Sequence, residues 1–141
     1  MKYYVGEAIY DCTVRQGIKV LDEKYYRLKH KEDKYCLLLL ERDSNYDVLY
    51  VDDNGWKSVV YFELVEDDKL YIVDVAPLYI NEGIGKNAFN LLFNYIRQTN
   101  LIKKIYGRTS PIDDQHADRK EHFFNKLGFT IDGRRISRVF K

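Results

Sequence analysis

The sequence predicts an α+β domain with a single mixed, mostly antiparallel sheet flanked by helices. Three observations predict this class. Short apolar strand patterns follow one another between residues 35 and 76, with turn residues between them. Two segments with helical spacing of apolar residues come later. A strand pattern lies between these two helices, and a strand that follows a crossover helix pairs in parallel with the strand before it.

The composition is typical of one globular domain. The chain has 141 residues, of which 45% are hydrophobic and 32% are charged, and we take residues 1–141 as that single domain. The net charge is +1, so we expect neither a nucleic acid nor a membrane as partner. We find no signal peptide and no apolar run long enough to span a membrane, and we expect a cytoplasmic protein. The two cysteines, Cys12 and Cys36, do not form a metal-ligand spacing, so we expect buried thiols and no metal site.

The first 45 residues allow two interpretations around residues 22–34. Leu21, Tyr25 and Leu28 fall at helical spacing, which predicts a helix. Tyr26, Leu28 and His30 also alternate along the chain, which predicts one arm of a hairpin. Periodicity alone does not decide between these two interpretations.

The remaining elements follow from clearer patterns. Asn54-Gly55 tolerates positive φ and predicts a tight hairpin turn. Gly128 stands where a helix commonly ends. We expect Trp56 and the many tyrosines to contribute to the core of the sheet. The predicted strands cover residues 35–41, 46–51, 56–66, 69–76, 103–109, 129–132 and 136–140, and the predicted helices cover residues 84–98 and 114–127.

Two glycines, Gly83 and Gly85, lie where a predicted strand leads into a predicted helix. Without a Cβ atom the backbone can approach a ligand closely. The first N–H groups of a helix have no partner within the helix, and the helix dipole favours negative charge there. The pair of glycines is therefore consistent with a phosphate site or with a simple turn.

The segment VDVAPLYINEGIGKNAFNLLFNYI resembles the acetyl-CoA loop of the GNAT N-acetyltransferase superfamily. Val75-Ala76-Pro77 matches the end of the family's strand, and residues 81–85 match its glycine loop. The later segment EHFFNKLGFTIDG resembles a second motif of the family through Phe123, Lys126, Gly128 and Phe129. The resemblance covers residues 46–141, and residues 1–45 align with no motif of the family.

The resemblance implies a GNAT-like fold and transfer of an acetyl group from acetyl-CoA, as cosubstrate, to an amine that attacks the thioester directly. It places the diphosphate on the N–H groups of residues 81–86 and the pantetheine arm in a gap beside the third strand of the meander. The backbone N–H near Val75 would donate to the carbonyl oxygen as that oxygen gains charge. The residues assigned to cofactor binding are Val73, Val75, Asn81, Glu82, Gly83, Ile84, Gly85, Lys86, Phe123 and Lys126.

The amine must lose a proton, and Asp74 and Glu63 are the nearest candidate bases by chain position. Asp74 stands between Val73 and Val75, and an apolar environment would favour its neutral form. The alternative interpretation is that Asp74 points to solvent on an alternating strand.

The sequence departs from the family pattern in three places, one of them at Ala117 and Lys120, where the family often has Asn and Ala. Ile80 replaces the Arg or Gln of the phosphate loop, and Phe124 replaces the tyrosine that in many members protonates the departing thiolate. His122, His116 and Tyr106 are candidate substitutes for that acid. These departures keep open an alternative function, a catalytically weak or inactive GNAT-shaped module that binds acyl-CoA or another protein.

Arg134, Arg135, Arg138 and Lys141 form a basic cluster near the C-terminus. The cluster is consistent with a solvated face, or with binding of an acidic acceptor or of the 3′-phosphate of the cofactor. The acceptor itself, a small-molecule or peptide amine, is not identified by the sequence. Exposed strand edges in such sheets often pair, so a homodimer is also consistent with the sequence.

Overall fold

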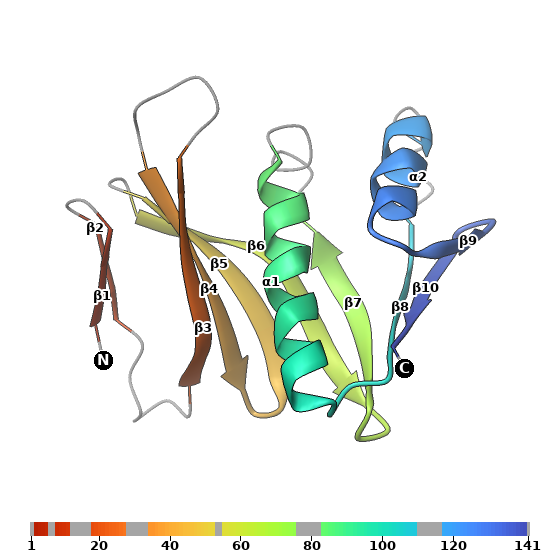
Figure 1. The fold of residues 1–141 in the computed structure, drawn as a ribbon, viewed down its shortest axis with the longest axis horizontal. Coiled ribbons are helices and arrows are strands. Elements are labelled where there is room, and N and C mark those ends of the chain that lie inside the picture. The colour runs from red at the N-terminus through yellow and green to blue at the C-terminus, as the bar shows by residue number, and fades with distance from the viewer. Residues whose placement is uncertain are drawn as a thin grey trace.

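The computed structural model describes residues 2–5, 8–11, 18–27, 34–52, 55–75, 83–109 and 117–140. One large sheet carries α1 across one face, and α2 lies near the end of β8 (Figure 1). The strands are β1 (Lys2–Val5), β2 (Ala8–Asp11), β3 (Ile18–Arg27), β4 (Lys34–Arg42), β5 (Asn45–Asp52), β6 (Gly55–Val65), β7 (Lys69–Val75), β8 (Lys104–Arg108), β9 (Thr130–Asp132) and β10 (Arg135–Val139), and the helices are α1 (Ile84–Thr99) and α2 (Ala117–Lys126).

The large sheet has eight strands in the order β3-β4-β5-β6-β7-β8-β10-β9. Neighbouring strands in this sheet are antiparallel, except for β7 and β8, which are parallel. Since β7 and β8 are joined through α1, the parallel pair is the crossover that the sequence predicted. The predicted α+β class with one mixed, mostly antiparallel sheet is therefore confirmed.

The first third of the chain is made of strands. β3 pairs with β4, with Tyr25 opposite Cys36 and Tyr26 opposite Tyr35. The hairpin interpretation is therefore correct for residues 22–27, and the helical one is wrong there. The ladder with β4 pairs backbone groups that a helix would have paired internally. Residues 28–33 lie outside the described part of the chain.

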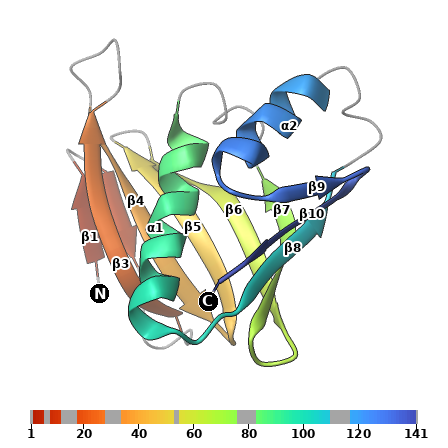
Figure 2. The same ribbon diagram turned by 45° about the vertical axis from the view of Figure 1, so that its right-hand side comes forward.

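A separate two-stranded sheet, formed by β1 and β2, precedes the large one. β1 contacts β4, and β2 contacts β5 and β6. Seen from α1, this small sheet lies behind β3 and β4 (Figure 2). The large sheet thus has α1 on one face and the small sheet against part of the other.

The buried residues of β4 alternate between these two faces. Leu37 and Leu39 belong to the main core, which includes α1, whereas Leu38 and Leu40 belong to a second cluster on the opposite face. Cys36 also lies in this second cluster as a buried free thiol, and burial raises its pKa to about 11. The expected buried thiol is confirmed for Cys36, while Cys12 lies outside the described residues.

Aromatic rings fill the core between α1, α2 and the sheet. Phe89 of α1 is fully buried, and its ring centroid is 5.7 Å from that of Phe62 on β6. Phe123, Phe124 and Phe129 surround Phe89 from the other side, with centroids 5.8, 6.0 and 5.9 Å away. Both helices are therefore attached to the same cluster of phenylalanines.

The expectation for Trp56 was wrong, because 55% of its surface is exposed. Trp56 is the second residue of β6 and lies opposite Val51, a residue of the second cluster. It therefore stands at a strand end, on the face that α1 does not cover. The tyrosines Tyr35, Tyr46 and Tyr50, by contrast, are buried in the main core as expected.

Within the described part of the chain, no helix is both long enough and apolar enough to cross a membrane.

Candidate functional site

α1 begins directly after a glycine in an unusual backbone conformation. Gly83, the N-cap residue, has φ 76° and ψ −2°, the left-handed conformation that glycine adopts without a Cβ penalty. No side chain in the described part of the chain caps the first N–H groups of α1, and the first turn of this helix contains no acidic residue. Among the described residues, no atom lies within 4 Å of the place where a Cβ of Gly83 would stand. These N–H groups can therefore receive an anion.

The structure places the predicted loop residues Gly83, Ile84, Gly85 and Lys86 at this N-terminus. Ile84 and Gly85 are buried, which fixes the start of α1 against the core, and Lys86 is exposed. Asn81, Glu82 and Ile80 lie outside the described residues.

β7 and β8 separate close to the start of α1. Their bridge partners run only from Lys69 and Lys104 to Tyr71 and Tyr106. β8 continues along β10 as far as Arg108, whereas β7 continues along β6 as far as Val75. Both ribbon views show the two strands diverging toward the end where α1 begins (Figures 1 and 2).

An irregularity in β7 accompanies this separation. Tyr61 pairs with Asp74, but the next residue, Phe62, pairs with Ile72, so that Val73 is the extra residue of a bulge. Val73 is 45% exposed. The last residues of β7 have no bridge partner on β8 in the described part of the chain, and a strand edge of this kind suits a ligand in extended conformation.

The residues predicted to act on the amine lie around this bulge. Val75 is half-buried and packs against the main core, whereas Asp74 is exposed. Asp74 shares its face of the sheet with Tyr61, opposite the face covered by α1. Glu63 is exposed on the same face, opposite Tyr71. Asp74 therefore points to solvent, where an amine can reach it.

The two predicted residues of α2 have different environments. Phe123 is buried against Phe89, and Lys126 is exposed in the last turn of the helix. Phe124 is only 5% exposed and lies 5.4 Å from the ring of Phe129. Among the substitute acids, His122 is exposed on α2, Tyr106 lies on β8 facing away from α1, and His116 is outside the described residues.

The side chains of the predicted basic cluster do not share one surface. Arg138 turns inward, with its guanidinium 4.3 Å from the ring centroid of Phe93 and 4.9 Å from that of Phe140. It also donates a hydrogen bond to the carbonyl oxygen of Leu127 at the end of α2. Arg134 and Arg135 are both exposed, and Arg135 alternates with the buried Ile136 on β10. Lys141 lies outside the described residues.

One carboxylate was missed by the sequence analysis. Asp47 lies opposite Tyr61 on the same face as Asp74 and is half-buried. Burial raises the pKa of the Asp47 carboxyl, although the hydroxyl of Ser58, which donates to it at 2.6 Å, opposes this shift. Asp47 alternates with apolar residues like any exposed strand residue, so no sequence signal marked it.

Within the described part of the chain, no group of three or more His, Cys, Asp or Glu side chains is arranged to hold a metal ion.

No protein-family model and no curated protein sequence matches the chain. Solved structures do share its fold. A ribosomal-protein-S5-alanine acetyltransferase from Vibrio fischeri superposes with a TM-score of 0.51 and 14% sequence identity. The match covers 69% of this chain and 62% of that protein's length. An acetyltransferase of the GNAT family from Staphylococcus aureus Mu50 superposes with a TM-score of 0.52 and 17% identity, over 70% of this chain and 69% of the other. The chain therefore has the fold of the GNAT acetyltransferase superfamily.

Proposed function

We propose that the protein is an acetyl-CoA-dependent N-acetyltransferase. The observation that carries this proposal is the position of the uncapped N-terminus of α1 beside the separating ends of β7 and β8. One feature suits a diphosphate and the other suits an extended arm, and acetyl-CoA contains both. The GNAT fold supports the same conclusion.

The residues present fit this cosubstrate. The N–H groups after Gly83 would bind the diphosphate, since no side chain of the described residues caps them and the first turn of α1 contains no acidic residue. The unpaired side of β7, from Ile72 to Val75, would bind the pantetheine arm as an added strand. Acetyl-CoA supplies the activated acetyl group, as a thioester.

The amine needs a base, because an alkyl amine with a pKa of about 10 is mostly protonated at neutral pH. Asp74 is the better candidate of the two predicted bases, since it adjoins the bulge whereas Glu63 lies nearer the turn between β6 and β7. Asp74 would accept the proton of the amine and return it to water. The N–H of Val75 would stabilise the charge that develops on the carbonyl oxygen.

Phe124 favours a second candidate function, a GNAT-shaped module that binds acyl-CoA without turnover. Phe124 has no hydroxyl to protonate a thiolate, and its ring is buried among Phe89, Phe123 and Phe129. A thiolate can leave without a dedicated acid, because thiols ionise not far above neutral pH. The two functions therefore differ in turnover and not in cofactor binding.

Calorimetric titration of the protein with acetyl-CoA and with CoA tests the cofactor site. We expect dissociation constants in the micromolar range, and no binding at millimolar concentration would refute both functions. Thiol release with a panel of amines then separates them. If the protein is an enzyme, Asp74→Asn should lower kcat and remove the base from the pH profile while CoA affinity is retained.

A further inference from the structure

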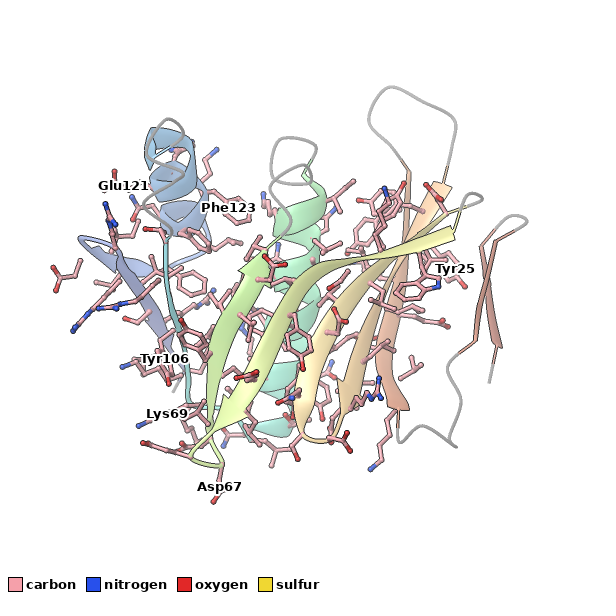
Figure 3. The ribbon with its side chains drawn as sticks, turned by 180° about the vertical axis from the view of Figure 1, so that it is seen from behind. Tyr25, Asp67, Lys69, Tyr106, Glu121 and Phe123 are labelled. Carbon is pink, nitrogen blue, oxygen red and sulfur yellow. The ribbon has the colours of Figure 1, made fainter. Side chains whose placement is uncertain are left out.

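A groove of about 420 Å³ lies on the face of the sheet opposite α1, over β7, β8, β10 and β9. Figure 3 views the molecule from this side, with Tyr106 labelled on β8. We call it the β7–β9 groove, and its defining residues are Tyr71, Lys104, Tyr106, Arg108, Asp132 and Arg135.

Strand register brings these side chains together. On β8, Lys104, Tyr106 and Arg108 alternate with the buried residues Ile105 and Gly107, so the three share one face. Arg135 on β10 lies directly opposite Arg108, and Asp132 on β9 lies directly opposite Arg135. Residues from four strands therefore point to one side of the sheet.

The groove has an excess of positive charge. It contains three cations, Lys104, Arg108 and Arg135, and one carboxylate, Asp132. Like charges directly opposite each other on adjacent strands destabilise a sheet. Although Arg108 and Arg135 form such a pair, neither makes an ion pair with a carboxylate in the part of the chain that the structure describes. Their charges are available to an anionic ligand.

Two tyrosines form the wall of the groove nearest the candidate active site. The rings of Tyr71 and Tyr106 are 5.3 Å apart and nearly edge to face, and Nζ of Lys104 lies 5.7 Å from the centroid of Tyr106. Tyr71 and Tyr106 are also the last bridge partners before β7 and β8 separate. The groove thus begins at the point where the gap for the pantetheine arm begins.

The groove also lies on the same face of the sheet as Asp74. The diphosphate site, by contrast, is at the start of α1, which packs on the other face. A molecule in the groove would therefore approach the bulge of β7 from the side opposite α1, where the candidate base is exposed.

We propose that the β7–β9 groove binds the negatively charged group, a carboxylate or a phosphate, of the amine acceptor. The inference rests on the proposed N-acetyltransferase function and names the substrate class, a small amine that carries an oxyanion. A volume of about 420 Å³ falls in the range of small-molecule sites. Arginine side chains suit carboxylate and phosphate because their planar forks bind such groups through two hydrogen bonds.

Matched amines with and without the anion test this proposal. We would titrate the protein with γ-aminobutyrate and butylamine, and with phosphoethanolamine and ethanolamine, by NMR in the absence of acetyl-CoA. The anionic member of at least one pair should bind at least about tenfold more tightly. The pair that shows the larger preference identifies the oxyanion as carboxylate or phosphate, and equal or weaker binding of both anionic members would overturn the proposal.

Three variants locate the effect. Arg108→Gln and Arg135→Gln should each remove most of the preference, whereas Arg134→Gln, a neighbouring exposed arginine that does not line the groove, should keep it. Retention of the full preference in the first two variants would overturn the assignment to this groove. Because all three arginines are exposed, we expect every variant to fold.

Two further measurements separate this inference from the proposed function. If anionic amines bind but no amine is acetylated, the anion site stands and the enzyme assignment fails. If acetyl transfer occurs and prefers neutral amines, only the groove proposal fails. If Arg135→Gln weakens the binding of CoA but not of dephospho-CoA, the groove binds the 3′-phosphate of the cofactor, which also overturns the inference.

Discussion

Gly83 combines a left-handed backbone conformation with the absence of a side chain. Both features suit the binding of an anion at the start of α1. Its φ of 76° is the left-handed conformation, which of the other residues Asn and Asp tolerate best. Gly83→Asp and Gly83→Asn are therefore matched variants of similar shape that differ in charge. We expect Gly83→Asp to weaken CoA binding at least about tenfold relative to Gly83→Asn, because its carboxylate would repel the diphosphate.

Calorimetry with CoA measures this difference, and circular dichroism of both variants controls for loss of helix. Equal CoA affinity in the Asp and Asn variants would mean that the diphosphate does not lie at the start of α1.

Arg138 has a structural role that the sequence concealed. Its guanidinium lies over the rings of Phe93 and Phe140 and donates a hydrogen bond to the carbonyl of Leu127, which attaches the end of α2 to β10. Burial, together with the nearby charge of Arg97, lowers the pKa of the Arg138 guanidinium. We expect Arg138→Ala to lower the free energy of unfolding by about 2–3 kcal/mol.

Urea denaturation measures this loss as a lower midpoint at unchanged slope. Arg135→Ala, at the exposed end of the same strand, should change the free energy of unfolding by no more than about 0.5 kcal/mol. Similar losses of unfolding free energy in the Arg138→Ala and Arg135→Ala variants would show that the packing of Arg138 stabilises the fold no more than an exposed arginine does.

At the scale of the elements, Phe89 of α1 packs against both the sheet and α2. Its ring contacts Phe62 on β6 and both Phe123 and Phe124 on α2. We expect Phe89→Ala to cost about 3–5 kcal/mol of unfolding free energy, since the cavity would lie between three elements. Phe89→Leu refills part of that space and should cost less.

Urea denaturation and the near-ultraviolet circular dichroism of the phenylalanine and tyrosine rings check this prediction together. Phe140 is half-buried at the margin of the cluster, so Phe140→Ala is the matched control and should cost less than Phe89→Ala. An equal cost for the two variants would contradict the central position of Phe89.

Most elements could be predicted because their local signals agree with their tertiary contacts. The predicted helix 84–98 was observed as Ile84–Thr99, and the strand predicted at 46–51 as Asn45–Asp52. The structure of residues 22–27 could not be predicted, because their apolar residues fit both the spacing of a helix and the alternation of a strand. Pairing with β4 decides between the two, and pairing is a long-range property.

For the whole molecule, tyrosines in the core and packed against it make the free energy of unfolding depend on alkaline pH. Burial raises the pKa of Tyr26 and of Tyr46 from 10.0 to about 12, and that of Cys36 from 9.0 to about 11. As pH rises, such groups lose their protons first in the unfolded chain, which favours unfolding. We therefore expect the free energy of unfolding to be unaffected by these groups below about pH 9 and to fall between about pH 9 and pH 12.

Urea denaturation at several pH values in this window tests the prediction, and Tyr46→Phe should reduce the decline because it removes one of the three groups. A free energy of unfolding that stays constant up to about pH 12 would contradict it.

The candidate site could be predicted only in part. The glycine loop has a local sequence signature, and the resemblance to the GNAT family located it. The β7–β9 groove has none, because Lys104, Arg108 and Arg135 come together only through the register of β8 with β10. The sequence grouped Arg138 with Arg135 by proximity, but alternation along β10 places the two side chains on opposite faces.

The short parallel contact between β7 and β8 gives the sheet a seam. On one side lies the antiparallel meander from β3 to β7, and on the other the smaller unit of β8, β10 and β9. Bridges from residues 69–71 to residues 104–106 join the two units, and the phenylalanine cluster spans them from the side of α1. A ligand bound in extended conformation beyond Tyr71 would lengthen this contact between the two units. Cosubstrate binding should therefore also stabilise their association and slow their separation.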